Sequence, residues 1–166
     1  MSSDKIVSDL QKVNPSAVIE LFTLTLDNSL HGATTTYRFH AGTSLKDNGE
    51  IIWAGNSYTR YPVEASGFKY GKGQLPRPTL TFSNAVGTIS AILLTVNAIT
   101  TGNDLTGATV KRIRTKAKFL DAANFPSNVN PYGTPDNTAE YPQEIYLIDR
   151  KSSENRTVVQ FELAAV

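Results

Sequence analysis

Positions 110–121 read VKRIRTKAKFLD, and this alternation of cationic and apolar residues restricts the local fold more than any other stretch of the chain. In a β-strand, successive side chains point to opposite faces of the sheet. One face would then carry Arg112, Arg114, Lys116 and Lys118, and the other Ile113, Thr115, Ala117 and Phe119. We therefore predict a half-buried strand over residues 108–120 with one cationic face.

Further strands are predicted where β-branched and aromatic residues gather between turn residues. These segments are residues 17–26, 34–40, 51–53, 57–59, 79–82, 143–149 and 156–166. The short Ala54-Gly55-Asn56 connection predicts a hairpin, because a short Gly-containing link between two strand-like runs is a hairpin signal. Residues 150–155 (RKSSEN) are predicted to form the turn of a closing hairpin.

Two segments instead show helical spacing of apolar residues. In residues 1–15, Ile6, Leu10 and Val13 recur at helical intervals, which predicts a short amino-terminal helix or arm. Residues 86–97 predict a second helix, with Ser83 or Asn84 as its cap. Short strands with few helices indicate a mainly β fold, a β-barrel or sandwich with one or two short α-helices.

The longest irregular segment covers residues 121–142 and contains four prolines. Loops of this length inside a compact domain are usually functional or disordered. Proline also lowers the entropy that a segment loses when it docks. From the residues alone we therefore expect this loop to be functional or disordered.

The length of 166 residues fits one domain, so we predict a single β-rich domain over residues 16–166, preceded by the 1–15 arm. Sixteen Lys and Arg against fifteen Asp and Glu give a net charge of +1. A basic site must therefore be local. No stretch resembles a secretory signal peptide or a membrane span, so we expect a soluble protein.

The sequence predicts no catalytic, metal or cofactor site. Cysteine is absent, which excludes thiolate metal ligands and cysteine nucleophiles within this chain. His31 and His40 lack metal-ligand spacing, and we expect surface or structural roles for them. The Gly67, Gly71 and Gly73 pattern matches no phosphate-binding loop, and the acidic pairs have spacings that ordinary surfaces produce.

Two interpretations of the cationic face stay open at this point. The face is a nucleic-acid site, or it is a solvated or subunit-facing surface. Glu144, Asp149 and Glu162 on the predicted closing hairpin would pair with its cations across strands. Exposed pairs of this kind contribute about 0.2–1 kcal/mol each. The near-neutral total charge favours the second interpretation.

Several motifs in fixed order resemble the minor tail protein L family of lambda-like tailed bacteriophages, from about residue 17 to the end of the chain. The motif residues are Trp53, Gly55, Tyr58, Tyr61 and Pro62, then the Ser66-Gly67-Phe68 and Gly71-Lys72-Gly73 pair, Arg77-Pro78-Thr79-Leu80, Ser83-Asn84, Arg112, Phe119-Leu120-Asp121-Ala122 and Asn124-Phe125. No single motif is diagnostic, but their order and spacing together are fairly specific.

The resemblance implies a structural, non-enzymatic component of the tip of a long non-contractile tail, between the tail tube and the central hub. It also implies a β-rich ring-building domain, assembly in the host bacterial cytoplasm and a role in DNA delivery. Family members bind an iron–sulfur cluster through cysteines of a carboxy-terminal domain, which this sequence lacks, so no cofactor is expected in this chain. The alternatives are a nucleic-acid-binding β module using residues 110–119 and, less favoured, a cell-wall hydrolase.

On this interpretation the partners are hub and distal tail-tube proteins, other copies of the chain in a ring, and DNA passing through the tail, contacted without sequence specificity. No small-molecule substrate is expected. The candidate interface or lumen-facing residues are Arg112, Arg114, Lys116, Lys118, Phe125, Pro131 and Tyr132.

Overall fold

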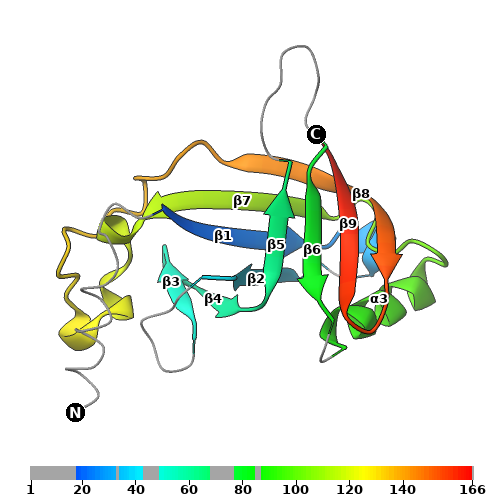
Figure 1. Cartoon of the computed structure of the whole chain (residues 1–166), viewed down its shortest axis with the longest axis horizontal. Coiled ribbons are helices and arrows are strands. Elements are labelled where there is room, and N and C mark those ends of the chain that lie inside the picture. Colours follow the sequence, from blue (N-terminus) through cyan, green and yellow to red (C-terminus); the bar gives the residue numbers. More distant parts are fainter. Residues whose placement is uncertain (1–17, 33, 43–48, 68–76, 85–86, 166) are drawn as a thin grey trace. The chain divides into compact units, whose positions relative to one another are not determined.

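The computed structural model describes residues 18–32, 34–42, 49–67, 77–84 and 87–165, and strands dominate them (Figure 1). The strands are β1 (Val18–Thr25), β2 (Thr36–His40), β3 (Ile51–Trp53), β4 (Asn56–Arg60), β5 (Val63–Ser66), β6 (Thr79–Ser83), β7 (Thr109–Lys116), β8 (Glu144–Glu154) and β9 (Val158–Ala165). The helical elements are α2 (Asn28–His31), α3 (Thr88–Ile99) and the 3-10 turns η1 (Ala117–Phe119), η2 (Ala122–Asn124) and η3 (Pro126–Asn128). The predicted mainly β fold with short helices is confirmed. The helix predicted over residues 1–15 lies outside the described residues.

The strands form one mixed sheet in the order β3-β4-β2-β1-β7-β8-β9-β6-β5. Contacts divide the chain into two compact units, each described here by itself. Unit 1 holds the residues up to Phe22, Arg38–Arg60 and Arg112–Glu144, and unit 2 holds the rest. The division falls within β1, β2, β7 and β8. The single domain over residues 16–166 stays a prediction.

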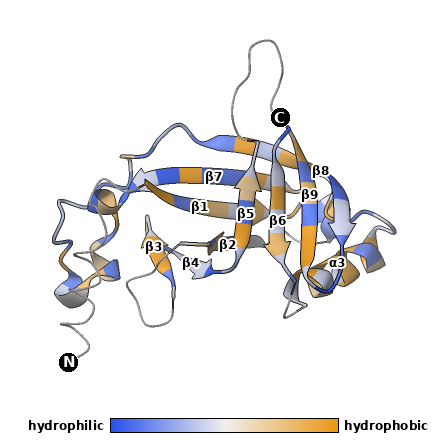
Figure 2. Cartoon of the chain, in the orientation of Figure 1, coloured by the Kyte–Doolittle hydropathy of each residue, from blue (hydrophilic) through white to orange (hydrophobic). Residues whose placement is uncertain are grey.

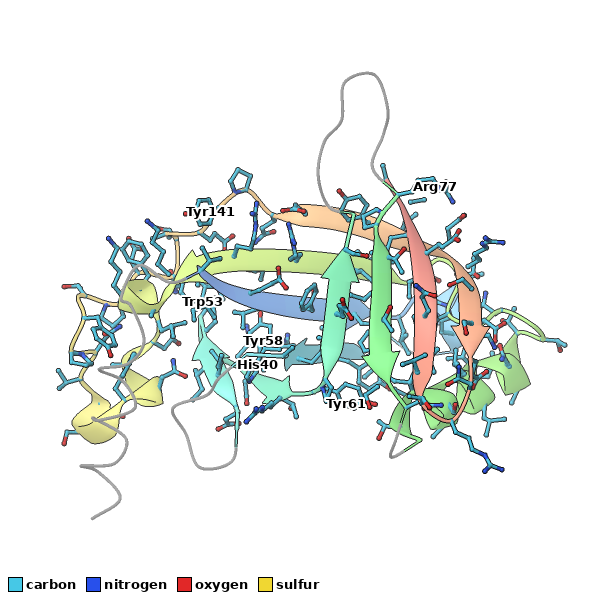
Figure 3. All side chains as sticks on the ribbon, viewed as in Figure 1. His40, Trp53, Tyr58, Tyr61, Arg77 and Tyr141 are labelled. Atoms are coloured by element: carbon cyan, nitrogen blue, oxygen red, sulfur yellow. The ribbon has the colours of Figure 1, made fainter. Side chains whose placement is uncertain are left out.

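The β3–β4 hairpin is the centre of unit 1. Trp53 pairs with Asn56, so the turn has only two residues, Ala54 and Gly55, with φ of 51° and 78°. Two consecutive positive φ values are typical of the type I′ turn that matches the twist of paired strands. Trp53 on β3 and Tyr58 on β4 are both buried, and His40 of the neighbouring strand β2 lies near them (Figure 3). The predicted hairpin is confirmed, with a turn one residue shorter than expected.

The hairpin packs on the segment that follows β7. Its cluster of buried residues consists of Leu21, Ile51, Trp53, Tyr58, Ile113, Leu120 and Phe125. Burying a side chain of this size stabilises a fold by about 1.5–3 kcal/mol. The motif residues that lie far apart in the sequence, Trp53 and Tyr58 with Leu120 and Phe125, are therefore partners in one core.

Two side chains of the same segment bind the hairpin backbone. The amide of Asn124 accepts the N–H of Ile52 at 2.7 Å and donates to its carbonyl at 2.6 Å. The carboxylate of Asp121 accepts the N–H groups of Ala54 and Gly55 at 2.9 and 2.8 Å. β3 is the first strand in the sheet order, so Asn124 satisfies at Ile52 the backbone groups that a further strand would otherwise bind.

The strand predicted over residues 108–120 is correct only as far as Lys116, where β7 ends. Ala117–Phe119 form η1 instead, so Lys118 and Phe119 do not continue the alternation. The buried amide of Asn130 explains the turn, because its Nδ2 donates to the carbonyls of Ala117, Lys118 and Leu120 at 3.1–3.3 Å. Within β7 the predicted alternation holds, since Ile113 and Thr115 are buried.

Unit 2 contains the antiparallel neighbours β5, β6, β9 and β8. Val159, Phe161 and Leu163 are fully buried, and Figure 2 shows hydrophobic and hydrophilic bands alternating along β9. Most of the turn predicted at 150–155 is wrong, because β8 runs on to Glu154. Its register shifts next to Arg150 and Ser153 accommodate the extra residues as β-bulges.

The helix predicted over residues 86–97 is present as α3, two residues further along, after Gly87. Asn84 is not its cap. Instead its Nδ2 donates to Ser90 Oγ at 2.9 Å and to the Asn155 carbonyl at 2.7 Å, which fixes the helix to the β8–β9 turn. The four-residue α2 was not predicted, although Asp27 caps its N–H groups and Gly32 ends it with φ 77°.

We predict that Asn124→Ala lowers the free energy of unfolding by about 1–3 kcal/mol, since it leaves the Ile52 N–H and carbonyl without partners. Urea denaturation of the full chain measures this difference. Asn137→Ala is the control, because Asn137 is exposed. Equal losses in both variants would contradict the role given to Asn124.

Candidate interface site

The cationic face of β7 begins with a compact ion cluster inside unit 1. Arg112 Nη1 donates to Glu20 Oε2 of β1 at 3.0 Å, and its Nη2 donates to both oxygens of Glu144 at 2.7 and 2.9 Å. Arg114 Nη2 lies 2.9 Å from the same carboxylate. Only 12% of the Arg112 side chain and 9% of the Glu144 side chain are exposed. Two cations and two carboxylates therefore neutralise one another, with Arg112 and Glu144 largely shielded from water, whereas 41% of the Glu20 side chain and 35% of the Arg114 side chain are exposed.

This cluster corrects the expected exposed pairing on two counts. Glu144 does pair with β7, but as a nearly buried bidentate partner rather than as a surface residue. Asp149 and Glu162 do not pair with β7, because Asp149 binds Arg77 at 2.5 Å and Glu162 binds Arg150 at 2.8 Å, both within unit 2. Partner choice across a sheet depends on register and order of strands, which residue spacing does not determine.

Lys116 and Lys118 differ from the two arginines. Within the part of the chain that the structure describes, neither lysine makes an ion pair. Lys116 lines a small open cleft of about 260 Å³ with Phe119, Glu140 and Tyr141. Lys118 Nζ lies 5.2 Å from the Phe119 ring centroid.

Tyr141, one of the residues that line the cleft, also contacts a cation. The Arg114 guanidinium lies 5.3 Å from the ring centroid of Tyr141, a cation–π contact. The Tyr141 N–H also donates to the Arg114 carbonyl at 2.9 Å. Thr115 donates its hydroxyl to the Ala139 carbonyl at 2.7 Å, so the loop before β8 is held along β7. Cations and aromatic rings thus share one surface of unit 1.

The three remaining candidate residues lie in the loop after β7. Phe125 is 4% exposed and belongs to the core cluster, where its ring meets Tyr132 edge-on at 6.2 Å. Pro131 is exposed. Burial raises the pKa of the Tyr132 hydroxyl. An interface role for these residues, as for the four cations, stays a prediction.

The sequence analysis missed Glu20 and Tyr141 as members of this site. A signal was present for Glu20, since it is the only charged residue in the otherwise apolar run AVIELFTLTL. A lone charge in such a strand indicates a buried or half-buried partner. Tyr141 follows an irregular segment and has no comparable signal.

The histidines are structural and buried, not exposed. His40 Nδ1 accepts the Gly42 N–H at 3.1 Å, and its Nε2 bonds the Gly49 carbonyl at 2.7 Å, so the ring is neutral. Burial is the main cause that lowers the pKa of His40 below its ordinary value, and the charge of Arg60 acts in the same direction.

The described residues carry neither a metal site nor a membrane-spanning helix. These contain no cluster of His, Asp or Glu that could hold a metal ion, and none of their helices is long and apolar enough to cross a membrane. The sequence has no cysteine, so its residues do not fit an iron–sulfur cluster.

We predict that the chain loses stability as the pH falls below about 6.5, because the unfolded chain then takes up a proton that folded His40 resists. The contribution is full above that pH and decreases by at most about 1.4 kcal/mol per pH unit for one proton. Urea denaturation at about pH 7.5 and 5.5 measures it. His40→Gln should show a smaller difference between the two conditions, and an unchanged difference would contradict this assignment.

We also predict that Glu144→Gln lowers the free energy of unfolding by about 3–5 kcal/mol, because it leaves two neighbouring arginines without their shared carboxylate. Glu162→Gln is a matched control, since Glu162 also pairs with one arginine in two-point contact and approaches a second, but at an exposed site. Thermal and urea denaturation should show only a small effect there. A large loss in the control and a small one at Glu144 would reverse the assignment.

Comparison with known proteins supports the resemblance found in the sequence. The family model described as phage minor tail protein L matches residues 30–166. Tail tip protein L of Escherichia phage lambda is 40% identical over 87 residues, which cover 52% of this chain and 34% of that protein. The aligned part thus spans about a third of the length of this relative.

Proposed function

The chain belongs to the phage minor tail protein L family, and we propose that it acts in the tail tip as a structural link between the distal tail tube and the central hub. The observation that carries this proposal is the family match, which covers residues of both units. The role includes assembly of the tail in the host cytoplasm and delivery of DNA through the finished tip. Hub proteins, tube proteins and other copies of the chain in a ring are its partners.

The chemistry of unit 1 supports a structural rather than a catalytic role. Glu20, Glu144, Arg112 and Arg114 bind one another, and Asp121 and Asn124 bind the hairpin backbone. Groups committed to such bonds serve rigidity, whereas a general acid or base needs access to a substrate. We therefore propose a non-enzymatic protein.

The same network favours a protein partner for the cationic face over a nucleic acid. Arg112 and Arg114 are neutralised by carboxylates, so they attract phosphates far less than four free cations would. Lys116 and Lys118 are left as the charges that a neighbour would meet. One observation supports nucleic-acid binding. Lys116 lines one cleft together with Phe119 and Tyr141, and aromatic rings beside cations bind single strands.

Charge reversal separates these two functions. We predict that Lys116→Glu and Lys118→Glu, each introduced into the phage that encodes the chain, lower the yield of joined, infectious particles by disturbing a subunit contact. Particle counts and electron microscopy of tails measure this. Arg156→Glu, at an exposed position of unit 2, should leave the yield unchanged.

The competing function is tested with the purified chain. Binding to random duplex and to single strands is measured at about 50 and 200 mM salt. Micromolar binding with a logarithmic salt slope near −2, lost in both lysine variants, would assign the face to nucleic acid, since two phosphate contacts give about that slope. Joined tails from phage that lack the gene would refute the tail-tip role itself.

A further inference from the structure

Helix α3 borders an apolar groove in unit 2. The groove has a volume of about 660 Å³. Its walls include Leu26, Tyr37, Ala91, Ile92, Thr95 and Ile99. None of the residues that line it is Asp, Glu, Lys or Arg. A site of this kind binds apolar side chains, because a charged group would lose its hydration there without gaining a partner.

The one histidine on the groove wall, His31, has both ring nitrogens bonded within the fold. Its Nδ1 accepts the Asp27 N–H at 2.8 Å. Its Nε2 lies 3.1 Å from the Thr106 carbonyl and donates to it. Both ring nitrogens are therefore occupied, and His31 offers no polar handle to a ligand. The groove is built for a hydrophobic partner.

The helix itself lacks the surface that water-facing helices carry. Residues 78–103 contain no charged residue, and α3 lies within them. Ile99 on the groove wall is 55% exposed, and Ala91 and Thr95 are exposed beside it. An exposed helix face normally carries charged side chains, and small or apolar residues there let another helix approach closely. α3 therefore presents the surface of an unfilled helix–helix contact.

We propose that the amino-terminal segment, residues 1–15, of one copy binds as an amphipathic helix in the α3 groove of a second copy. Ile6, Leu10 and Val13 would form its apolar stripe, while Asp4, Lys5 and Lys12 would face water. Eleven residues from Ser3 to Val13 span about 16 Å as a helix, close to the roughly 18 Å of the twelve residues of α3. Length and polarity of the segment thus match the groove.

The contact is head-to-tail, because it joins the segment of one copy to a different part, the groove, of the next. Such heterologous contacts continue from copy to copy and close into a ring when the rotation permits. This geometry deepens the proposed tail-tip function and rests on it for its biological purpose. The association itself can be tested in solution without phage, so failure of this contact and failure of the tail role give different results.

Complementation between two full-length variants tests the proposal. Leu10→Glu spoils the segment and leaves the groove intact, and Thr95→Lys spoils the groove and leaves the segment intact. Sedimentation velocity should show that each variant self-associates about tenfold or more weakly than the parent chain, since a charge enters an apolar contact. An equal mixture should recover pairs, because the segment of the Thr95→Lys chain can enter the groove of the Leu10→Glu chain.

Matched controls add the same charges outside the contact. Ser8→Glu lies opposite the stripe of the segment, and Leu94→Lys lies on α3 at an exposed position away from the groove. Both should self-associate like the parent. Circular dichroism and melting curves verify that all four variants are folded.

Four results would overturn the proposal. The parent chain stays monomeric at every concentration, or the controls weaken association as much as the test variants. The third result is that neither variant self-associates alone and their equal mixture also stays monomeric. That result would place the segment in the groove of its own chain. Sensitivity to Thr95→Lys without sensitivity to Leu10→Glu would give the groove a different occupant.

Discussion

The carboxylate of Glu144 is the point on which the arrangement of unit 1 depends. It lies at the start of β8 and binds two arginines of β7, one of which also binds Glu20 of β1. Three strands are therefore joined by ion pairs whose central members, Arg112 and Glu144, are largely shielded from water. A buried pair gains little net energy over an apolar core, but removing one member is costly, so such a cluster selects one register among competing ones. The cluster holds β7 in place, and β7 in turn positions the loop of residues 121–142 and the cleft lined by Phe119 and Tyr141.

A second principle of the fold is that side chains complete the backbone where strands stop. Asn124 does so at β3, Asp121 at the hairpin turn, and Asn130 at the end of β7. All three belong to the loop of 121–142, which is irregular in path but closely bonded at these points. The family motif Phe119-Leu120-Asp121-Ala122 with Asn124-Phe125 thus packs on and binds the hairpin that carries Trp53 and Tyr58. Its order along the chain reflects a contact in space.

Residue patterns alone were sufficient for the parts of the fold that depend on local periodicity. The alternation in β9, the existence of the β3–β4 hairpin and the helical spacing of α3 each arise from neighbours in sequence. The end of β7 could not be predicted, because the amide of Asn130, ten to thirteen residues further on, takes the carbonyls that would have continued the strand. The burial and ion pairs of Arg112 could not be predicted either, since its partners come from β1 and β8. For α2 a signal existed in the sequence, because Asp27 is a capping residue and Gly32 is suited to end a helix.

The closure of β3 by Asn124 also bears on how the chain avoids unwanted polymers. An open strand edge is a template for amyloid-like stacking, and proteins that accumulate before assembly are the most exposed to that hazard. A side-chain amide that occupies both backbone groups of Ile52 removes the template at that point without adding charge. Aggregation through this edge would first require the hydrogen bonds between Asn124 and Ile52 to break. These bonds therefore act as a kinetic barrier against misassembly, while other surfaces stay available for correct contacts.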